Sequence, residues 1–206
     1  MVKPRGRKPP SSPRRLPGAE RREAVLKAAL PLFAVRGEHG TTTRELAAAA
    51  GVTEPVLYRH FASKEALFEA VLARARDRVL DRLSDAVSNV HGVPARLNAL
   101  GERLQPILAE CEDEFRVLNG AAATHADERM AALVRGAYAR FGEFLSSAVA
   151  GSGLRRGVDA ETAGHLLLEV GLGAALTRPL AVPGVARPDY GPAAMRILLR
   201  AIARPR

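Results

Sequence analysis

The chain has 206 residues, of which 47% are hydrophobic and 26% are charged, and this composition excludes collagen-like and fully disordered proteins. Its formal net charge of +9 predicts a polyanionic partner, such as nucleic acid or an anionic membrane surface. Most of this charge lies in residues 1–22, which hold eight Lys or Arg and a single Glu, so the rest of the chain is nearly neutral.

The single cysteine, Cys111, predicts a chain without an intramolecular disulfide or a multi-thiolate metal site, and it fits a reducing compartment. No apolar run approaches the roughly 20 residues that span a bilayer. Proline and basic residues also follow Met1, where a signal peptide would be apolar. We therefore expect a cytoplasmic protein with no membrane partner.

Residues 1–18 contain five prolines among basic residues and almost no apolar side chains, which predicts a flexible basic arm. From about Gly18 onward, Ala and Leu recur at helical spacing, and the aromatic content is only 4%. These features predict an all-α fold.

The first predicted helix ends near Gly37. Its apolar stripe has the spacing of one helical face and consists of Val25, Ala28, Ala29, Leu32 and Phe33. Pro31 interrupts this stripe and removes the bond to the Lys27 carbonyl, so we expect a local bend or a 3₁₀ turn there.

Three further helix starts are predicted before residue 70. The threonines at 41–43 supply an N-cap for a short helix, with Glu45 placed to pair back to the cap and Gly51 as the stop. Thr53 caps the next helix, and Ser63 caps a fourth. Later apolar stripes predict helices around residues 97–108, 130–148, 159–174 and 194–202, and residues 112–114 form the acidic first turn of another.

Residues 42–64, TTRELAAAAGVTEPVLYRHFASK, predict a helix-turn-helix. Two short helices flank a tight turn at Gly51, and small alanines allow them to cross closely. The inward-facing apolar positions are Leu46, Ala47, Val52 and Leu57. In such a motif the second helix lies in the major groove of DNA.

Four motifs in order, LFAVRG, TTTRELAAAAGV, LYRHF and SKEALF, resemble the DNA-binding domain of the TetR family of bacterial transcriptional regulators. The resemblance covers about residues 20–72. It implies an all-α protein with a three-helix DNA-binding domain over 19–72 and a helical ligand-binding and dimerisation domain over 73–206. It also implies a homodimer and a small-molecule effector. Pro55 departs from the family pattern, which often has a small residue there.

Candidate DNA contacts fall into two groups. Thr43, Tyr58 and Lys64 are placed to bind phosphates, and Arg44, Thr53, Glu54, Val56, Arg59 and His60 to contact base edges or nearby phosphates. In the alternative interpretations, Tyr58 packs against the first helix and Lys64 is an ordinary surface lysine. The basic arm either contacts DNA or is only a solvated tail.

The larger domain carries two further hypotheses. Residues 159–178 are rich in small residues and, with the stripe at 194–202, could form a four-helix dimer interface, or both segments could be ordinary core helices. Polar or aromatic residues on apolar helices suggest a ligand cavity, and these are Gln105, Cys111, Phe115, Asn119, His125, Tyr138, Phe141 and His165. Each of these residues alone is more often an ordinary core or surface residue than part of a ligand site.

The leading hypothesis is a homodimeric repressor that binds a palindromic DNA operator and releases it when a small molecule binds. A ligand-binding signalling module with a purely structural helix-turn-helix is the first alternative, and a nucleoid-type protein that uses only the basic arm is another. We expect no enzymatic activity, cofactor or metal, because no nucleophile–base pair, phosphate-binding glycine loop or metal-ligand cluster is present in the sequence.

Overall fold

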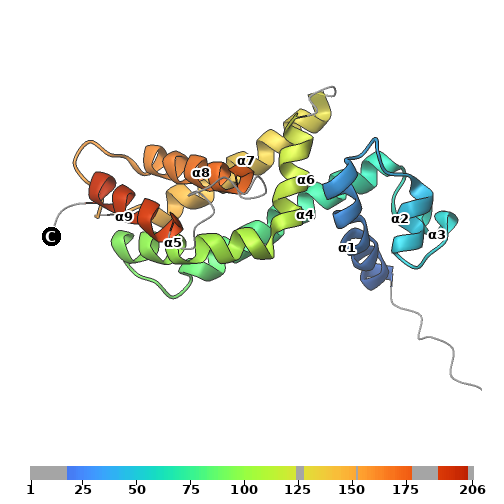
Figure 1. Cartoon of the computed structure of the whole chain (residues 1–206), viewed down its shortest axis with the longest axis horizontal. Helices are drawn as coiled ribbons and strands as arrows, with labels where there is room; N and C mark the ends of the chain where they lie inside the picture. Colours follow the sequence, from blue (N-terminus) through green and yellow to red (C-terminus); the bar gives the residue numbers. More distant parts are fainter. Residues whose placement is uncertain (1–17, 124–127, 152, 178–189, 204–206) are drawn as a thin grey trace, which may run out of the picture.

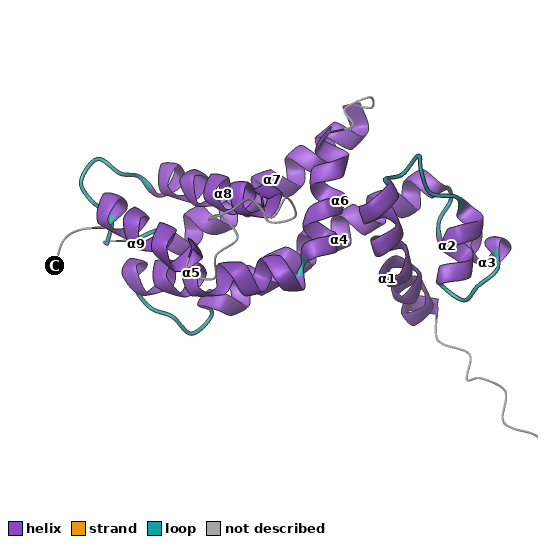
Figure 2. Ribbon diagram, in the orientation of Figure 1, coloured by secondary structure: helices purple, strands orange, loops and turns teal. Residues whose placement is uncertain are grey.

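The computed structural model describes residues 18–123, 128–151, 153–177 and 190–203, and the predicted basic arm lies almost entirely outside them. The described residues form helices and no strand, so the all-α prediction is confirmed (Figure 2). The helices are α1 (Gly18–Arg36), α2 (Thr43–Ala49), α3 (Glu54–His60), α4 (Lys64–Val87), α5 (Val93–Glu110), α6 (Glu112–Ala123), α7 (Glu128–Val149), α8 (Ala160–Thr177) and α9 (Tyr190–Ile202).

The molecule is elongated, with α1–α3 gathered at one end and α5, α7, α8 and α9 at the other (Figure 1). The long helix α4 runs between the two ends and passes through residue 72, where the sequence analysis placed a domain boundary. Helix α7 packs along α8, and α5 packs along α9. Helix α6 packs against both α1 and α4, so it joins the two ends of the molecule.

Helix α1 is α-helical from Gly18 to Arg36, so the 3₁₀ turn expected at Pro31 does not form. Pro31 and Lys27 are both exposed. The unpaired Lys27 carbonyl can therefore bond to water, which makes the proline tolerable inside the helix. The predicted helix end is confirmed, because Gly37 has a φ of 66° and donates its N–H to the Phe33 carbonyl at 2.9 Å.

The main hydrophobic core extends across the predicted boundary between the two domains. One cluster of buried side chains combines Phe33 of α1, Leu57 of α3 and Phe68 of α4 with Val117 of α6 and Phe141 of α7. A second cluster lies between α5, α7, α8 and the end of α9. Because α1, α4 and α6 share one core, a shift of α6 must repack the helices that carry the helix-turn-helix.

A buried carboxylate lies inside the shared core. Helix α6 begins at Glu112 with an acidic first turn, as predicted, but Glu114 is only 4% exposed and pairs with Arg78 of α4 at 3.0 Å. Burial beside this pair raises the pKa of the Cys111 thiol, so the thiol stays protonated at neutral pH. Glu114 is therefore more than a member of an acidic first turn, because it also ties α6 to α4.

Candidate DNA-binding surface and ligand cavities

Helices α2 and α3 form a helix-turn-helix with a short, well-defined turn. Gly51 has a φ of 64°, which glycine adopts without strain, and the Val52 N–H donates to the Ala47 carbonyl at 2.9 Å. Leu46 and Leu57 are fully buried on the facing sides of the two helices. The turn and this apolar contact fix the outer face of α3 relative to α2.

The start of α2 is held by a reciprocal cap. The Thr42 side chain accepts from the Glu45 N–H at 3.3 Å, and the Glu45 carboxylate accepts from the Thr42 N–H at 3.0 Å. Arg36 of α1 pairs with the same carboxylate at 2.6 Å. The hydrogen bonds from Thr42 and the guanidinium of Arg36 lower the pKa of Glu45 to about 2. The predicted cap is therefore confirmed, and it also ties α2 to α1.

Two of the predicted DNA contacts bond to each other in the free protein. The Thr43 hydroxyl at the start of α2 donates to the Glu54 carboxylate at the start of α3 at 2.6 Å. Arg44, next along α2, is exposed and forms no ion pair among the described residues. Thr43 must therefore share its hydroxyl with Glu54 or exchange that partner when it meets a phosphate.

The outer face of α3 is open to solvent. Tyr58 is 47% exposed, and Thr53 and Arg59 are exposed, whereas Val56 and His60 are half-buried. Thr53 occupies the N-cap position without a side-chain bond to the helix, so its hydroxyl is free. The exposure of Tyr58 speaks against the alternative in which it packs against α1.

Lys64 does not extend from the surface as a free cation. Its ammonium group donates to the backbone carbonyls of Glu38 at 2.8 Å and Thr41 at 3.3 Å. These carbonyls belong to the loop between α1 and α2, so Lys64 attaches that loop to the start of α4. The phosphate contact stays a prediction, and the geometry gives Lys64 a structural role beside it.

The predicted ligand residues do not line a single cavity. Phe115 of α6 and Phe141 of α7 line a small apolar cavity of about 60 Å³, whose other walls come from α4, α5 and α8. Phe115 and Asn119 line a larger cavity of about 750 Å³. Tyr138 lines neither, but it donates to the Asn119 side chain at 2.6 Å and packs edge-on against Phe141. Burial raises the pKa of Tyr138 to about 12.

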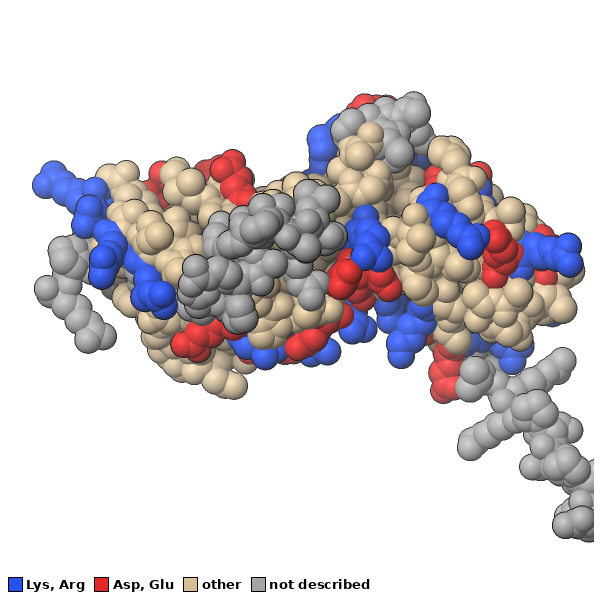
Figure 3. All heavy atoms as spheres, viewed as in Figure 1, with Lys and Arg blue, Asp and Glu red and all other residues tan. Residues whose placement is uncertain are grey.

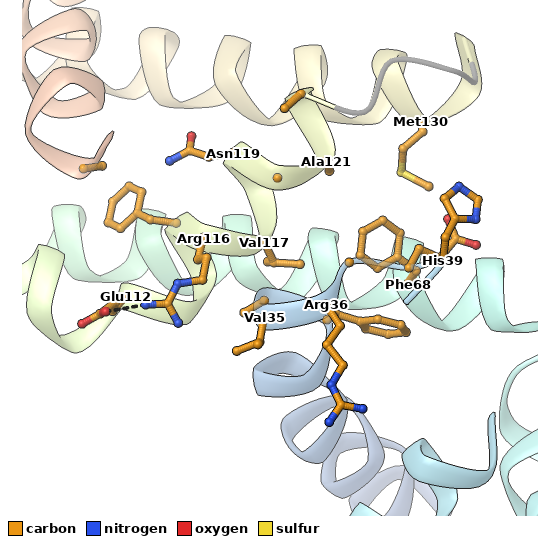
Figure 4. Close-up of a pocket in the computed structure, with 18 of the residues that line it drawn as sticks. Val35, Arg36, His39, Phe68, Glu112, Arg116, Val117, Asn119, Ala121 and Met130 are labelled. Carbon is orange, nitrogen blue, oxygen red and sulfur yellow. Dashed lines mark hydrogen bonds and ion pairs between the residues drawn. The ribbon is translucent and has the colours of Figure 1, made fainter. Parts of the chain in front are cut away.

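The remaining members of that set lie elsewhere. Gln105 and the exposed His165 line neither cavity, Cys111 is buried beside α4, and His125 lies outside the described residues. The larger cavity is built largely by residues that sequence reasoning missed, including Val35, Arg116 and Leu176 (Figure 4). They come from three helices that are distant in the sequence, and no local pattern brings them together.

The face drawn in Figure 3 carries both signs of charge: Asp and Glu side chains lie among Lys and Arg over much of it, and several basic side chains gather at its left end. Many of the charges are paired, as Arg74 is with Glu23 at 2.7 Å. None of the described helices is both long and apolar enough to cross a membrane. The described residues also contain no cluster of metal-binding side chains.

The helix-turn-helix region is recognised by a family model. Residues 25–71 match the model described as bacterial regulatory proteins, tetR family. Residues 25–71 are therefore similar to the helix-turn-helix region of TetR-family regulators. This agrees with the four motifs, which lie within or next to the matched residues.

Individual relatives extend the match beyond the helix-turn-helix. The HTH-type transcriptional activator FasR of Mycolicibacterium smegmatis is 36% identical over 104 residues, so the match spans 50% of this chain and about half (48%) of FasR. The nucleoid occlusion factor SlmA of Shewanella halifaxensis is 29% identical over 161 residues, 76% of this chain and 82% of SlmA. A TetR-family transcriptional regulator from Cytophaga hutchinsonii has the same fold, with a TM-score of 0.76 at 19% identity, over 94% of this chain and 100% of that one.

Proposed function

We propose that this protein is a cytoplasmic transcriptional repressor of the TetR family without enzymatic activity. It binds a palindromic operator as a homodimer through α2 and α3 and releases it when a small molecule binds among the C-terminal helices. The observation that carries the proposal is the exposed face of α3, where Thr53, Tyr58 and Arg59 stand free on a helix that Leu57 fixes against the core. A helix presented in this way fits the major groove.

The positions of the candidate side chains suggest which of them bind phosphates and which contact base edges. Thr43 and Tyr58 would bind phosphates on either side of the groove, and Arg44 and Arg59 would meet base edges or nearby phosphates. Glu54 bonds to Thr43 in the free protein, so it can be exchanged for a DNA group when Thr43 turns to a phosphate. The backbone contacts set the position of α3, and the base contacts supply the specificity.

Exposed apolar residues of α8 and α9, at the end of the molecule opposite α1–α3, support a dimer. Leu166 of α8 is 40% exposed and Ile197 of α9 is 70% exposed. Gly173 shares a face of α8 with Leu166, and a Cβ placed there would meet no heavy atom within 4 Å, so that face is open. A two-fold dimer formed here would present two copies of α3 to half-sites about 34 Å apart.

The shared core would connect small-molecule binding to release of the operator DNA. A molecule that binds among α5–α8 and prefers one position of α6 would move α6 against α1 and α4. The Arg78–Glu114 pair and the apolar contacts of Val117 connect these helices. The movement would change the spacing of the two recognition helices, and the affinity for the operator would fall.

Footprinting tests the proposal on the DNA that flanks the protein's own gene. We expect protection of a palindrome at physiological salt, and we expect Tyr58→Phe to weaken binding on all sequences alike. Arg44→Ala should lose affinity mainly at one base position if Arg44 contacts a base edge. Absence of a protected palindrome together with unchanged small-molecule binding would favour the signalling module with a structural helix-turn-helix.

A reporter assay tests the direction of the output. Deletion of the protein should raise transcription from the footprinted promoter, because a bound dimer would block it. A fall in transcription would identify an activator, the function that the name of the relative FasR gives.

A further inference from the structure

The larger cavity lies at the junction of the two ends of the molecule. It has a volume of about 750 Å³, and its walls come from the end of α1 and the start of α4 on one side and from α6 with the end of α8 on the other (Figure 4). This volume is in the range of sites that bury a small molecule. The 60 Å³ cavity among the C-terminal helices is much smaller and has a different lining, apart from Leu108 and Phe115.

The middle of this junction cavity is apolar. Phe33 and Phe68 pack edge-on in its floor, with ring centroids 4.9 Å apart. Val35 is 70% exposed and Leu176 is 54% exposed, although both are large apolar side chains, and both line the cavity. An apolar molecule seated here would remove these side chains from water, which is favourable.

Both arginines of the lining are already neutralised. Arg36 runs along α1 away from α6 and pairs with Glu45 at 2.6 Å (Figure 4). Arg116 pairs with Glu112 at 2.7 Å and with Asp113 at 3.4 Å. The cavity therefore offers no unpaired guanidinium to an anionic ligand.

Two carboxylates of the lining, Glu38 and Glu65, form no ion pair within the described part of the chain. The Ser63 side chain bonds to Glu65 and lowers its pKa, so this carboxylate stays ionised at neutral pH. His39 and Met130 lie with Phe68 at one end of the cavity, opposite the Glu112–Arg116 pair (Figure 4). Lys64, whose ammonium bonds to the Glu38 carbonyl at 2.8 Å and acts on Glu65, offsets one of the two carboxylates, and the remaining negative charge beside aromatic and thioether groups favours a cation.

We propose that the junction cavity binds a hydrophobic organic cation. The cationic group would lie against Glu38 and Glu65, and the apolar body would cover Val35 and Leu176. Because the ligand touches α1 and α4 on one side and α6 and α8 on the other, it would favour one relative position of the two ends of the molecule. Binding itself is independent of DNA, and only its effect on operator affinity rests on the proposed function.

Two probes of the same shape and opposite charge test the site on the purified full chain. Calorimetry should show that tetraphenylphosphonium binds at least about tenfold more tightly than tetraphenylborate, a difference of about 1.4 kcal/mol. Absence of phosphonium binding, or equal binding of both ions, would overturn the proposal. Because no DNA is present, a failed footprint leaves this result unaffected.

Substitutions locate the binding. The double variant Glu38→Gln/Glu65→Gln should lose most of the preference for the cation. Leu176→Ser should weaken phosphonium binding, and unlike Glu65, Leu176 has no contact with the helix-capping Ser63. Asp81→Asn removes one exposed carboxylate of α4 outside the cavity, so it should leave the affinity unchanged. The thermal unfolding midpoint of each variant checks that it is folded.

The same titration separates the two cavities. Gly171→Leu adds a side chain at a residue that lines only the small cavity, where a Cβ meets no heavy atom within 4 Å. We expect this variant to bind tetraphenylphosphonium as the wild type does. Loss of binding in Gly171→Leu, or full retention of the charge preference in the double glutamine variant, would assign the ligand to another place.

Discussion

Lys64 shows how one side chain can serve the fold at a position where the family pattern suggests DNA contact. It bonds to two carbonyls of the α1–α2 loop, so Lys64→Ala should lower the free energy of unfolding by about 1–3 kcal/mol, because both carbonyls lose their donor. Urea unfolding measures this, with Arg59→Ala as an exposed control that should be nearly neutral. Unchanged stability with a uniform loss of DNA affinity would instead assign Lys64 to phosphate binding.

Glu45 gives the cap of α2 a defined pH dependence. Its folded pKa of about 2 lies below its ordinary value of 4.5, so its contribution to stability is complete above about pH 4.5 and is lost as the pH falls towards 2. Glu45→Gln should therefore be less stable than the wild type at pH 7. The difference in thermal midpoint should shrink between pH 4.5 and 2, and a constant difference across that range would contradict the assignment.

Contacts between single side chains could be predicted from the sequence only where they are local. The cap of Thr42 by Glu45 follows from a spacing of three residues, and it was predicted. The bond of Thr43 to Glu54 depends on how two helices cross, so no local pattern contains it. Glu114 was within reach of prediction, because it shares the helical face of Val117 and Leu118, which the structure buries.

The packing of α7 against α8 depends on one small residue. A Cβ added at Gly164 would lie only 2.5 Å from the backbone nitrogen of Ser146. Gly164→Ala should therefore separate the helices and destabilise the protein by about 1–3 kcal/mol. Gly136→Ala in α7, where a Cβ meets nothing, should raise stability by up to about 1 kcal/mol through helix propensity. Urea unfolding of both variants compares them, and equal effects would contradict this packing.

Helices were predicted well where a cap or a glycine marks their ends. Thr42, Ser63 and Gly37 lie at ends that the structure confirms, because capping is a local interaction. The small residues of 159–178 were interpreted together as a possible dimer face, yet they divide between roles. Gly164 is needed for the close contact of α8 with α7 within one chain, whereas a Cβ at Gly173 would meet no heavy atom within 4 Å. Residue type alone could not separate these roles.

The proposed dimer is tested by charges placed on its apolar surface. Leu166→Asp/Ile197→Asp should give a monomer that keeps its helical content, because a buried unpaired charge is strongly unfavourable in an interface. Val35→Asp is the matched control, since Val35 is as exposed as Ile197 but lies at the end of α1, outside the proposed interface of α8 and α9, so this variant should remain dimeric. Sedimentation velocity distinguishes the two states, and a dimeric double variant would place the interface elsewhere.

At the scale of the whole molecule, the cavities were the least predictable feature. Phe115, Asn119 and Phe141 were chosen for their chemistry and do line cavities, but the junction cavity needs the end of α1 to meet α6 and α8. That meeting is a consequence of the shared core, in which α1, α4 and α6 pack as one unit. Sequence periodicity defines the buried face of each helix but not which helix covers it.

We propose that α2 and α3 of two protomers together bind a two-fold symmetric DNA sequence. Selection of bound duplexes from a random pool by the purified full chain tests it most directly. We expect enrichment of a palindrome whose half-sites are about 10 base pairs apart, centre to centre, or a multiple of one helical turn. Binding without any enriched sequence, abolished when residues 1–17 are deleted, would contradict it and assign the affinity to the basic arm alone.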